Sequence, residues 1–495
     1  MITDRIRKTL APNMACCSFA AIIRKALALC MACCGFAATA ALTACADFLE
    51  VEVKGRATIP NFLSDPEGLR AGLVGAYNAM YDYYDGEFMK YPDVAGNMLS
   101  MRATSGSMVN QYNYSSNQTQ ETEAVGHIWT NIYDAQCNVN NIIQYAPDVI
   151  SANPTKADEC RRYQGEAYLL RAMCHFDQCR TYAQPYNYTA DASHLGVPIL
   201  WKTPGADQNV SRSTVKQVYE AVLQDLGRAA EILTDDVAQD FRYASLQAVR
   251  CMYSRVYLYM EDWQHALEYA QLAIGSQQLA QADDYLDMYR DLTKQGEAIF
   301  RLSGYKMNGS LKSFYDQGTS ASPADTLLSL FDADDLRLQL ASVTDGGVRY
   351  TMKYSAKVVP ENDAKRDDPF VFRLSEEYLN AAEAAWQLGQ YSVARKYIRA
   401  IVERAVGAAK ADEVLAAYSD ATLIDLIRRE RVKELCFEGH NLWDITRWKQ
   451  DLVRESKTTS TVRRIDYPSD LFVLPIPQTE LFANENMQPN PTVNN

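Results

Sequence analysis

Apolar residues recur at helical spacing along much of this chain, and this spacing limits the possible folds more than any other feature. Within residues 165–182, Leu169, Ala172, Met173 and Phe176 fall at positions i, i+3, i+4 and i+7, on one face of a helix. Residues 218–233 repeat the pattern with four further apolar residues: Val222, Leu226, Ala229 and Leu233. The chain is therefore predicted to be mainly α-helical.

Two later stretches carry the pattern of helix-hairpin repeats. Small, aromatic and aliphatic residues occupy nearly matching offsets in both: Tyr253, Ser254, Tyr257, Ala266, Ala270 and Ala273 in the first, and Ala381, Ala382, Ala385, Ala394, Ile398 and Ile401 in the second. Small residues at these offsets let two antiparallel helices approach closely, as they do in tetratricopeptide repeats. The two stretches together predict tetratricopeptide-like helix pairs.

Polar, irregular segments separate the helical ones. Residues 101–122 are rich in Ser, Asn, Gln and Tyr, and residues 283–368 show little periodicity. Residues 467–495 are rich in Pro and Asn, with one short strand-like run at 471–476. Because no charge block or low-complexity linker divides the chain, we expect a single domain over residues 45–495. Its predicted parts are helical pairs mainly within 69–150, 160–275 and 372–450, and variable binding loops at 81–125 and 283–368.

The N-terminus has the order of an export signal. Arg24 and Lys25 precede an apolar, small-residue stretch at 26–44, ALALCMACCGFAATAALTA, which is followed by Cys45. A charged region, an apolar region and a small-residue cleavage site in this order are typical of secretory signals. The residues before Cys45 match the bacterial lipobox, so residues 1–44 are predicted to be a lipoprotein signal peptide, and Cys45 to carry lipid such as palmitate. An uncleaved membrane-spanning helix and ordinary secretion are the alternatives, and translation starts at either Met1 or Met14.

Charge argues against two classes of partner. The formal charge of the whole chain is -13, and residues 1–44 hold five basic side chains and one acid, so their removal brings it to -17. Such an acidic chain lacks the basic surface that nucleic acid or an anionic membrane requires. Neutral ligands such as sugars or peptides fit the composition better.

Cysteine and histidine spacing predicts no metal site and no cofactor. Six cysteines follow Cys45, and none forms a C-x-x-C pair: Cys137, Cys160, Cys174, Cys179, Cys251 and Cys436. We expect buried free thiols. The five histidines are also far apart, and His175, beside the apolar face of a helix, is expected to be a packing residue rather than a ligand.

Short motifs in a fixed order run along the whole chain after residue 44. They are CADFLE at 45–50, DPEGL at 65–69, LVGAY at 73–77, GEAYLLRA at 165–172, GVPIL at 196–200, RLSEEYLNAAE at 373–383, RERVKEL at 429–435, FEG at 437–439, WDITRW at 443–448, LPIP at 474–477 and QPNP at 488–491. In this order and spacing the chain resembles the SusD/RagB family of nutrient-binding outer-membrane lipoproteins from Bacteroidetes. The family's cysteine is usually followed at once by an acid, whereas here Ala46 precedes Asp47. The motif therefore does not decide which membrane leaflet the lipid enters.

The resemblance implies a fold, a partner and a location. The fold would be a tetratricopeptide-like helical scaffold with long irregular loops forming a ligand-binding lobe. The partner would be a SusC-like TonB-dependent β-barrel transporter, to which a lipid-anchored protein of the outer-membrane surface delivers captured oligo- or polysaccharide. The alternatives are a receptor for peptides rather than glycans, and a lipid-anchored scaffold that binds only proteins.

Three carboxylates on one helical ridge raise the possibility of a glycan hydrolase. Glu430, Glu434 and Glu438 follow each other at i, i+4, and paired carboxylates can perform acid–base chemistry. Like charges at this spacing destabilise a helix unless cations lie nearby. We therefore favour a structural ion network that supports Trp443 and Trp448, with four candidate cations: Arg429, Arg431, Lys433 and Arg447. Because nucleophile and phosphate-loop motifs are also missing, we predict a binding protein and no enzyme.

Loop aromatic residues are the candidate ligand contacts. Sugar rings stack on aromatic planes, and tyrosine adds a polar tip, while loops on a rigid scaffold usually carry binding residues. All six tryptophans fall in or beside scaffold motifs, so none of them is predicted to contact ligand. The predicted ligand-binding residues are Tyr83, Tyr84, Tyr91, Asn97, Tyr112, Tyr114, Tyr289, Tyr305, Phe314 and Tyr315, with Asn113, Asp316 and Tyr350 as further candidates.

Overall fold

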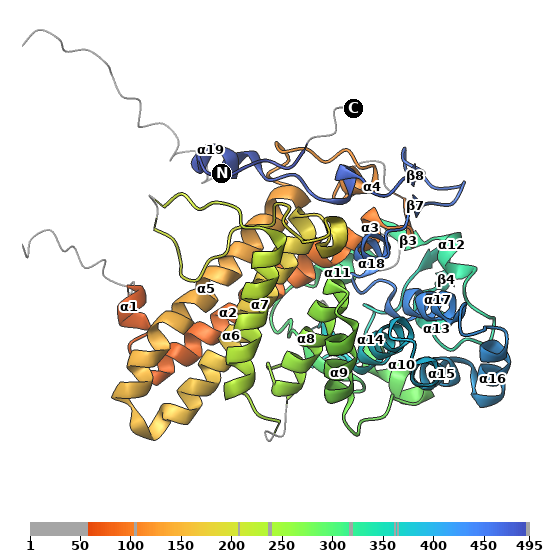
Figure 1. Cartoon of the computed structure of the whole chain (residues 1–495), viewed down its shortest axis with the longest axis horizontal. Coiled ribbons are helices and arrows are strands. Elements are labelled where there is room, and N and C mark those ends of the chain that lie inside the picture. The colour runs from red at the N-terminus through yellow and green to blue at the C-terminus, as the bar shows by residue number, and fades with distance from the viewer. Residues whose placement is uncertain are drawn as a thin grey trace, which may run out of the picture. The chain divides into compact units, whose positions relative to one another are not determined.

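The chain is mainly α-helical, with a few short strands, as the spacing of its apolar residues predicts (Figure 1). The computed structural model describes residues 58–102, 106–205, 208–235, 240–315, 320–360, 363 and 366–491. The predicted signal at 1–44, the lipid site Cys45 and the candidate Asp316 lie outside these residues. Residues Ile59–Asn495 form one compact unit.

Four long helices pack side by side in the first half of the chain (Figure 1). They are α2 (Pro66–Tyr83), α5 (Ala124–Ala152), α6 (Ala157–Tyr182) and α7 (Val215–Ile232), and the short α1 (Ile59–Phe62) precedes them. The side chain of Asp65 accepts a hydrogen bond from Gly68 N at 2.8 Å and so caps the start of α2. A Cβ atom on Gly165 would lie 2.8 Å from Ile232, so the glycine permits the close approach of α6 and α7.

The two predicted helix pairs are confirmed. Helix α8 (Leu246–Met260) packs on α9 (Trp263–Ile274), and α14 (Leu374–Gln387) packs on α15 (Tyr391–Val406). The small residues at the predicted offsets are fully buried between them: Ser254, Ala266, Ala270, Ala381, Ala382, Ala385 and Ala394. Helix α9 also packs on α14, so the two pairs form one layer.

Short elements fill the segments with little periodicity. After α2 come a π-helix, η2 (Tyr84–Phe88), and α3 (Met89–Ala95), β1 (Leu99–Met101) and α4 (Val109–Tyr112). The second irregular segment holds α10 (Ala282–Arg290), β2 (Ala298–Arg301), α11 (Ser310–Tyr315), β3 (Ala321–Pro323), α12 (Asp325–Leu328), α13 (Leu338–Ala341), β4 (Val343–Asp345) and β5 (Val348–Tyr350). The remaining elements are β6 (Phe370–Arg373), α16 (Ala408–Ala416), α17 (Leu423–Leu435), α18 (Asn441–Arg447), β7 (Leu452–Val453), β8 (Arg464–Ile465) and α19 (Gln478–Ala483), with 3-10 turns at Pro154–Lys156, Tyr186–Tyr188 and Asp470–Phe472.

Strands occur as antiparallel pairs, namely β1 with β3, β2 with β6, β4 with β5 and β7 with β8. The predicted strand-like run at 471–476 is wrong, because it begins in the 3-10 turn Asp470–Phe472 and pairs with no strand in the described part of the chain. Its Leu474 amide donates to the carbonyl of Thr181 on α6 at 3.0 Å. Pro475 and Pro477 supply no amide donors for a strand ladder.

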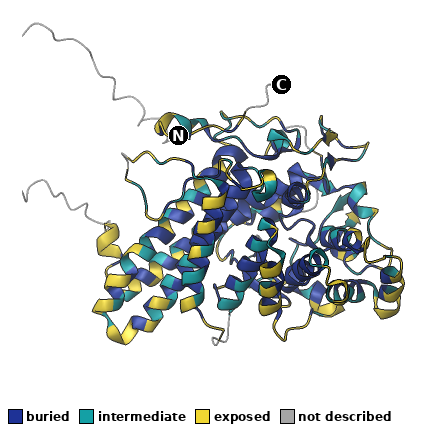
Figure 2. Ribbon diagram, in the orientation of Figure 1, coloured by how far each residue is buried: buried dark blue, intermediate teal, exposed yellow. Residues whose placement is uncertain are grey.

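The interior is a large apolar core that extends through both helical halves (Figure 2). Five of the six described cysteines are buried free thiols and Cys137 is half-buried, close to the prediction. His175 is buried, and its Nε2 accepts from the Leu200 amide at 3.0 Å. Burial lowers the pKa of His175 to about 3, so the ring is neutral, which confirms its packing role. None of the described helices is both long and apolar enough to cross a membrane.

All three glutamates lie in a buried ion network. Glu430 and Glu434 lie on α17, but the prediction of one helical ridge is wrong for Glu438, because the helix ends at Leu435 and Phe437 turns the chain with φ 63°. The Glu434 carboxylate forms ion pairs with the guanidinium groups of Arg373, Arg404 and Arg337, with N–O distances of 2.7, 2.5 and 3.2 Å. Glu438 pairs with Arg373 and Lys353, and Glu430 pairs with Arg337. The carboxylates are thus satisfied by cations of other elements, as a structural role requires.

The four cations predicted to neutralise the ridge are partly confirmed. Lys433 and Arg429 lie 3.0 and 3.4 Å from Glu430. The prediction is wrong for Arg431 and Arg447, because both pair with Asp444 at 2.8 Å. The support of the tryptophans is also separate from the ridge: Trp448 donates to Glu383 at 2.9 Å, and the Arg180 guanidinium lies 3.8 Å from the Trp443 ring.

Candidate functional site

Several of the predicted ligand-binding tyrosines lie inside the core. The hydroxyls of Tyr83 and Tyr84 donate to the same oxygen of Asp177, at 3.0 and 2.9 Å. Tyr289 donates to Glu438 at 2.8 Å, and Tyr315 donates to Asp93 at 3.2 Å. These four rings are at most 2% exposed. The structure therefore gives them packing partners, and their contact with ligand stays an untested prediction.

The other predicted residues are divided between the interior and the surface, and Tyr112 on α4 is among the buried ones. Phe314 is buried 5.5 Å from the Lys90 ammonium, and Tyr305 is 46% exposed beside Lys306. Asn97 donates its side-chain amide to the Val453 carbonyl at 3.1 Å. Asn113 accepts from the Thr461 amide at 3.0 Å, and Tyr350 is half-buried in β5. These polar groups hold loops together, and none of them lines the two hollows described below.

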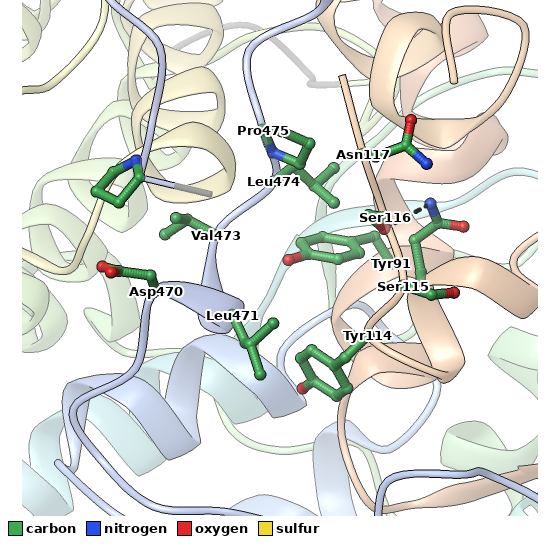
Figure 3. A pocket seen from close by; sticks show the side chains of 12 residues that line it. Tyr91, Tyr114, Ser115, Ser116, Asn117, Asp470, Leu471, Val473, Leu474 and Pro475 are labelled. Carbon is green, nitrogen blue, oxygen red and sulfur yellow. Dashed lines mark hydrogen bonds between the residues drawn. The ribbon is translucent and has the colours of Figure 1, made fainter. Parts of the chain in front are cut away.

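Two of the predicted tyrosines, Tyr91 and Tyr114, meet in one pocket of about 270 Å³ (Figure 3). The Tyr91 ring lies between two chain segments in this view. Tyr114 and the residues after it form one wall, and the segment 470–475 forms the facing wall. The full lining is Tyr91, Gln111, Tyr114, Ser115, Ser116, Asn117, Asp470, Leu471, Val473, Leu474, Pro475 and Pro491.

Helix α3 and the loop after α4 hold the two rings in place. Tyr91 projects from α3, and its hydroxyl lies 3.5 Å from the Phe472 carbonyl. Tyr114 adopts a left-handed backbone with φ 53°, and its hydroxyl donates to the carbonyl of Ala95 at the end of α3. The positive φ turns the chain after α4, so that the following Ser115 to Asn117 line the same pocket.

Arg454 links the end of α3 to α4 beside the pocket, and the sequence does not predict this role. Its guanidinium donates to the carbonyls of Val94, Ala95 and Gly96 at 2.8–3.0 Å. It also donates to the Tyr112 carbonyl and lies 4.4 Å from the Tyr112 ring and 5.3 Å from the Tyr114 ring. No local motif marks Arg454, because the partners that tie it to α3 and α4 lie more than 300 positions away.

The pocket combines aromatic rings with polar groups. The side-chain amide of Gln111 donates to Ser116 Oγ at 3.0 Å, while its buried Oε1 has no hydrogen-bond partner among the described residues. Asn117 and Ser115 are exposed at the rim, and Asp470 supplies a carboxylate. Burial raises the pKa of both phenols, although Arg454 partly lowers that of Tyr114, so both hydroxyls stay protonated. Such a lining suits a neutral ligand with an apolar face and several hydroxyl or amide groups.

A second hollow in the first predicted binding loop is more polar. It has a volume of about 590 Å³ and is lined by Glu87, Gly106, Ser107, Met108, Val109, Asn110, Thr122, Glu123, Ala124 and His127. His127 Nδ1 lies 3.6 Å from Glu87, and Asn110 donates to Glu123 at 2.7 Å. Among the described residues of this lining, His127 alone supplies a ring, so the pocket with Tyr91 and Tyr114 is the better candidate for stacking.

Two family models match complementary parts of this chain. Residues 335–492 match a model described as "SusD family", and residues 47–258 match one described as "Starch-binding associating with outer membrane". A curated relative, the SusD-like protein P38 of Formosa agariphila, is 23% identical over 91% of this chain and 96% of its own length.

Solved structures share the fold. A SusD superfamily protein from Bacteroides thetaiotaomicron has a TM-score of 0.77 and 25% identity, covering 86% of this chain and 100% of that one. A structure described as "Laminarin binding SusD-like protein" has a TM-score of 0.67 and 19% identity, covering 87% of this chain and 100% of that one. The predicted tetratricopeptide-like helical scaffold is thus confirmed by similarity as well as by the helix pairs themselves.

Proposed function

Because the chain belongs to the SusD/RagB family, we propose that it binds carbohydrate and holds a saccharide in the pocket formed by Tyr91, Tyr114 and the segment 470–475. The observation that carries this proposal is the convergence of two tyrosine rings with serine, asparagine, glutamine and aspartate side chains around one pocket. Tyr91 and Tyr114 are 2% and 7% exposed, so a sugar C–H face would contact only the part of each ring that the pocket opens, while its hydroxyls exchange hydrogen bonds with the polar groups. A laminarin-binding protein of the same fold supports the ligand class.

We further propose that the protein is lipid-anchored through Cys45 in the outer membrane and passes its glycan to a SusC-like TonB-dependent transporter. The signal-like order of residues 24–45 and the description of the matched N-terminal model support this location. The unaltered chain is expected to fractionate with the outer membrane together with a β-barrel partner, and to be released from it by Cys45→Ala. Membrane retention of that variant would count against the lipid anchor.

Calorimetry against panels of neutral glycans and peptides tests the ligand class. We expect binding to at least one glycan, and about fivefold weaker binding on replacing Asn117 or Asp470 by alanine, since one hydrogen bond contributes about 1 kcal/mol. Both side chains lie at the pocket rim, so the variants are expected to fold. Asn138→Ala is the matched control, because its amide bonds only to the carbonyl of Asp134 on the same helix.

Two results would contradict the saccharide proposal. One is a folded protein that binds no glycan; the other is unchanged glycan affinity in both rim variants. Binding to peptides alone would favour the peptide receptor. A scaffold that binds only proteins, which the helix pairs permit, would retain its partners in a membrane pull-down whether or not soluble polysaccharide is added.

A further inference from the structure

A larger hollow, of about 690 Å³, lies at the other end of helix α6. Its lining comes from the start of α6, the end of α7 and the loop before α8: Asp158, Arg161, Arg162, Glu231, Ile232, Leu233, Thr234, Asp240, Tyr243 and Ala244. Like the first pocket, it joins an aromatic ring and aliphatic side chains to charged and polar groups.

The two hollows are well separated along α6. Leu474 in the first pocket is hydrogen-bonded to Thr181, in the last turn of α6. Arg162 in the larger hollow lies in the second turn of the same helix. Nineteen positions separate Arg162 from Thr181, which corresponds to about 28 Å at 1.5 Å per residue. The larger hollow is therefore not an extension of the first pocket.

Tyr243 presents an aromatic ring that is open to solvent yet held in place. Its side chain is 49% exposed, and its ring meets that of Tyr77 at 5.8 Å and 89°. The Tyr77 hydroxyl donates to Glu166 at 2.6 Å and accepts from the amide of Ala244 at 2.8 Å. The backbone next to Tyr243 is thus tied to helices α2 and α6, which lowers the entropy cost of stacking a ligand on the ring.

The two arginines near the ring are held by acidic partners within α6. Arg161 pairs with Asp158 at 2.6 Å, and Arg162 pairs with Glu166 at 2.5 Å. The lining holds three acids, Asp158, Glu231 and Asp240, against two arginines. Because the lining carries both signs of charge, it favours neither an anionic nor a cationic ligand. A neutral polyol can instead accept from the guanidinium groups and donate to the carboxylates.

We propose that this hollow is a second saccharide site, in which a neutral sugar ring stacks on Tyr243 and contacts Ile232 and Leu233. The inference rests on the proposed function, because it assumes that the protein binds glycan. Two sites about 28 Å apart along one helix can engage the same polysaccharide chain, and the second contact then benefits from a high effective concentration. A short oligosaccharide cannot bridge them and gains no such advantage.

The test compares laminarin and soluble starch with trisaccharides of the same glucans. In Tyr243→Ala, polysaccharide affinity is expected to fall about tenfold or more. The trisaccharides are expected to keep their tighter site, because that site is the first pocket. Tyr391→Ala is the matched control, since Tyr391 is an exposed tyrosine, 36% accessible, outside both hollows. A triple variant, Asn117→Ala, Asp470→Ala and Tyr243→Ala, is expected to lose the residual polysaccharide binding that the double rim variant retains.

The outcomes separate the two proposals. Equal polysaccharide affinity in Tyr243→Ala and Tyr391→Ala, with weakened binding in the rim variants, would overturn the second site and leave the proposed function intact. Loss of trisaccharide binding in Tyr243→Ala but not in the rim variants would move the main site to the larger hollow and overturn the first-pocket assignment. Failure of the unaltered, folded chain to bind either glucan would overturn both for this class of glycan.

Discussion

Replacing Glu434 by glutamine is expected to lower the free energy of unfolding by about 3–5 kcal/mol, the usual cost of removing one partner from a buried ion network. Glu434 is fully buried on α17 and receives three guanidinium groups, those of Arg337, Arg373 and Arg404. The neutral amide would leave these positive charges without their shared counter-ion. The fold is expected to lose stability, rather than an activity.

The pH dependence of this loss distinguishes a charge effect from a packing effect. Burial alone would raise the pKa of Glu434, but Arg404, Arg373 and Arg337 together hold it well below the ordinary value of 4.5. The stabilisation is therefore fully present above pH 4.5 and is lost as the pH falls through the lower folded-state pKa. The difference between the unaltered chain and Glu434→Gln is expected to be constant near neutrality and to shrink in strong acid.

Urea unfolding at several pH values measures this effect. The matched control is Glu413→Gln, because Glu413 pairs with Lys410 on the surface, where such pairs contribute little. Equal stability of the two variants would contradict a structural ridge. Retained stability with loss of glycan hydrolysis would instead support the hydrolase that the three glutamates first suggest.

The ridge also shows what could be predicted from the sequence. Local spacing places Glu430 and Glu434 on one helix face, and the need of these carboxylates for cations follows from the pattern; Glu438 lies beyond the end of α17. The partners do not, because Arg337, Arg373 and Arg404 lie 97, 61 and 30 positions from Glu434. Local spacing suggests Arg431, and the motif of the family resemblance suggests Arg447, but the fold assigns both to Asp444.

The candidate site, too, could be predicted only in part from the sequence. The sequence predicts Tyr91 and Tyr114 to be loop aromatics, and both line the pocket. The loop assignment is wrong for Tyr91, which lies in helix α3. The facing wall at 470–475 comes from the far end of the chain, and its apolar run looked like a strand. Tyr83 and Tyr84 fail to reach this pocket because α2 continues into the π-helix η2, which turns both hydroxyls onto Asp177. Sequence composition identifies the aromatic residues, whereas only the path of the backbone decides which of these buried rings line a pocket.

Replacing Arg454 by methionine is expected to affect stability and saccharide binding together. The guanidinium is buried, and the backbone carbonyls that accept from it include those of Val94, Ala95, Gly96 and Tyr112. Methionine keeps an apolar stem of similar length but removes this donor from the Val94 and Gly96 carbonyls, whereas Ala95 and Tyr112 still accept from Tyr114 and Ser460. Because each unsatisfied buried group costs about 1–3 kcal/mol, the loss of stability is expected to reach about 3 kcal/mol.

Binding should weaken in the same variant because Arg454 joins the two segments that carry the pocket tyrosines. Its contacts run from the end of α3, which holds Tyr91, to the α4 segment before Tyr114. Released from these contacts, the rings would have to be ordered again by the ligand, so we expect saccharide affinity to fall about tenfold, at a cost of about 1 kcal/mol per immobilised side chain. Calorimetry at a temperature where the variant is folded measures this loss of saccharide affinity separately from the loss of stability.

Arg464→Met provides the matched control for Arg454→Met. Arg464 lies in the same C-terminal hairpin, is 58% exposed and pairs with Asp451 and Asp466 on the surface. It is expected to change neither the melting temperature nor the affinity appreciably. A folded Arg454→Met protein with unchanged saccharide affinity would show that Arg454 only stabilises the corner, and that Tyr91 and Tyr114 keep their places without it. A lower affinity in that protein, with Arg464→Met unchanged, would make Arg454 a positioning residue, which acts on the ligand solely through the rings and loop that it holds.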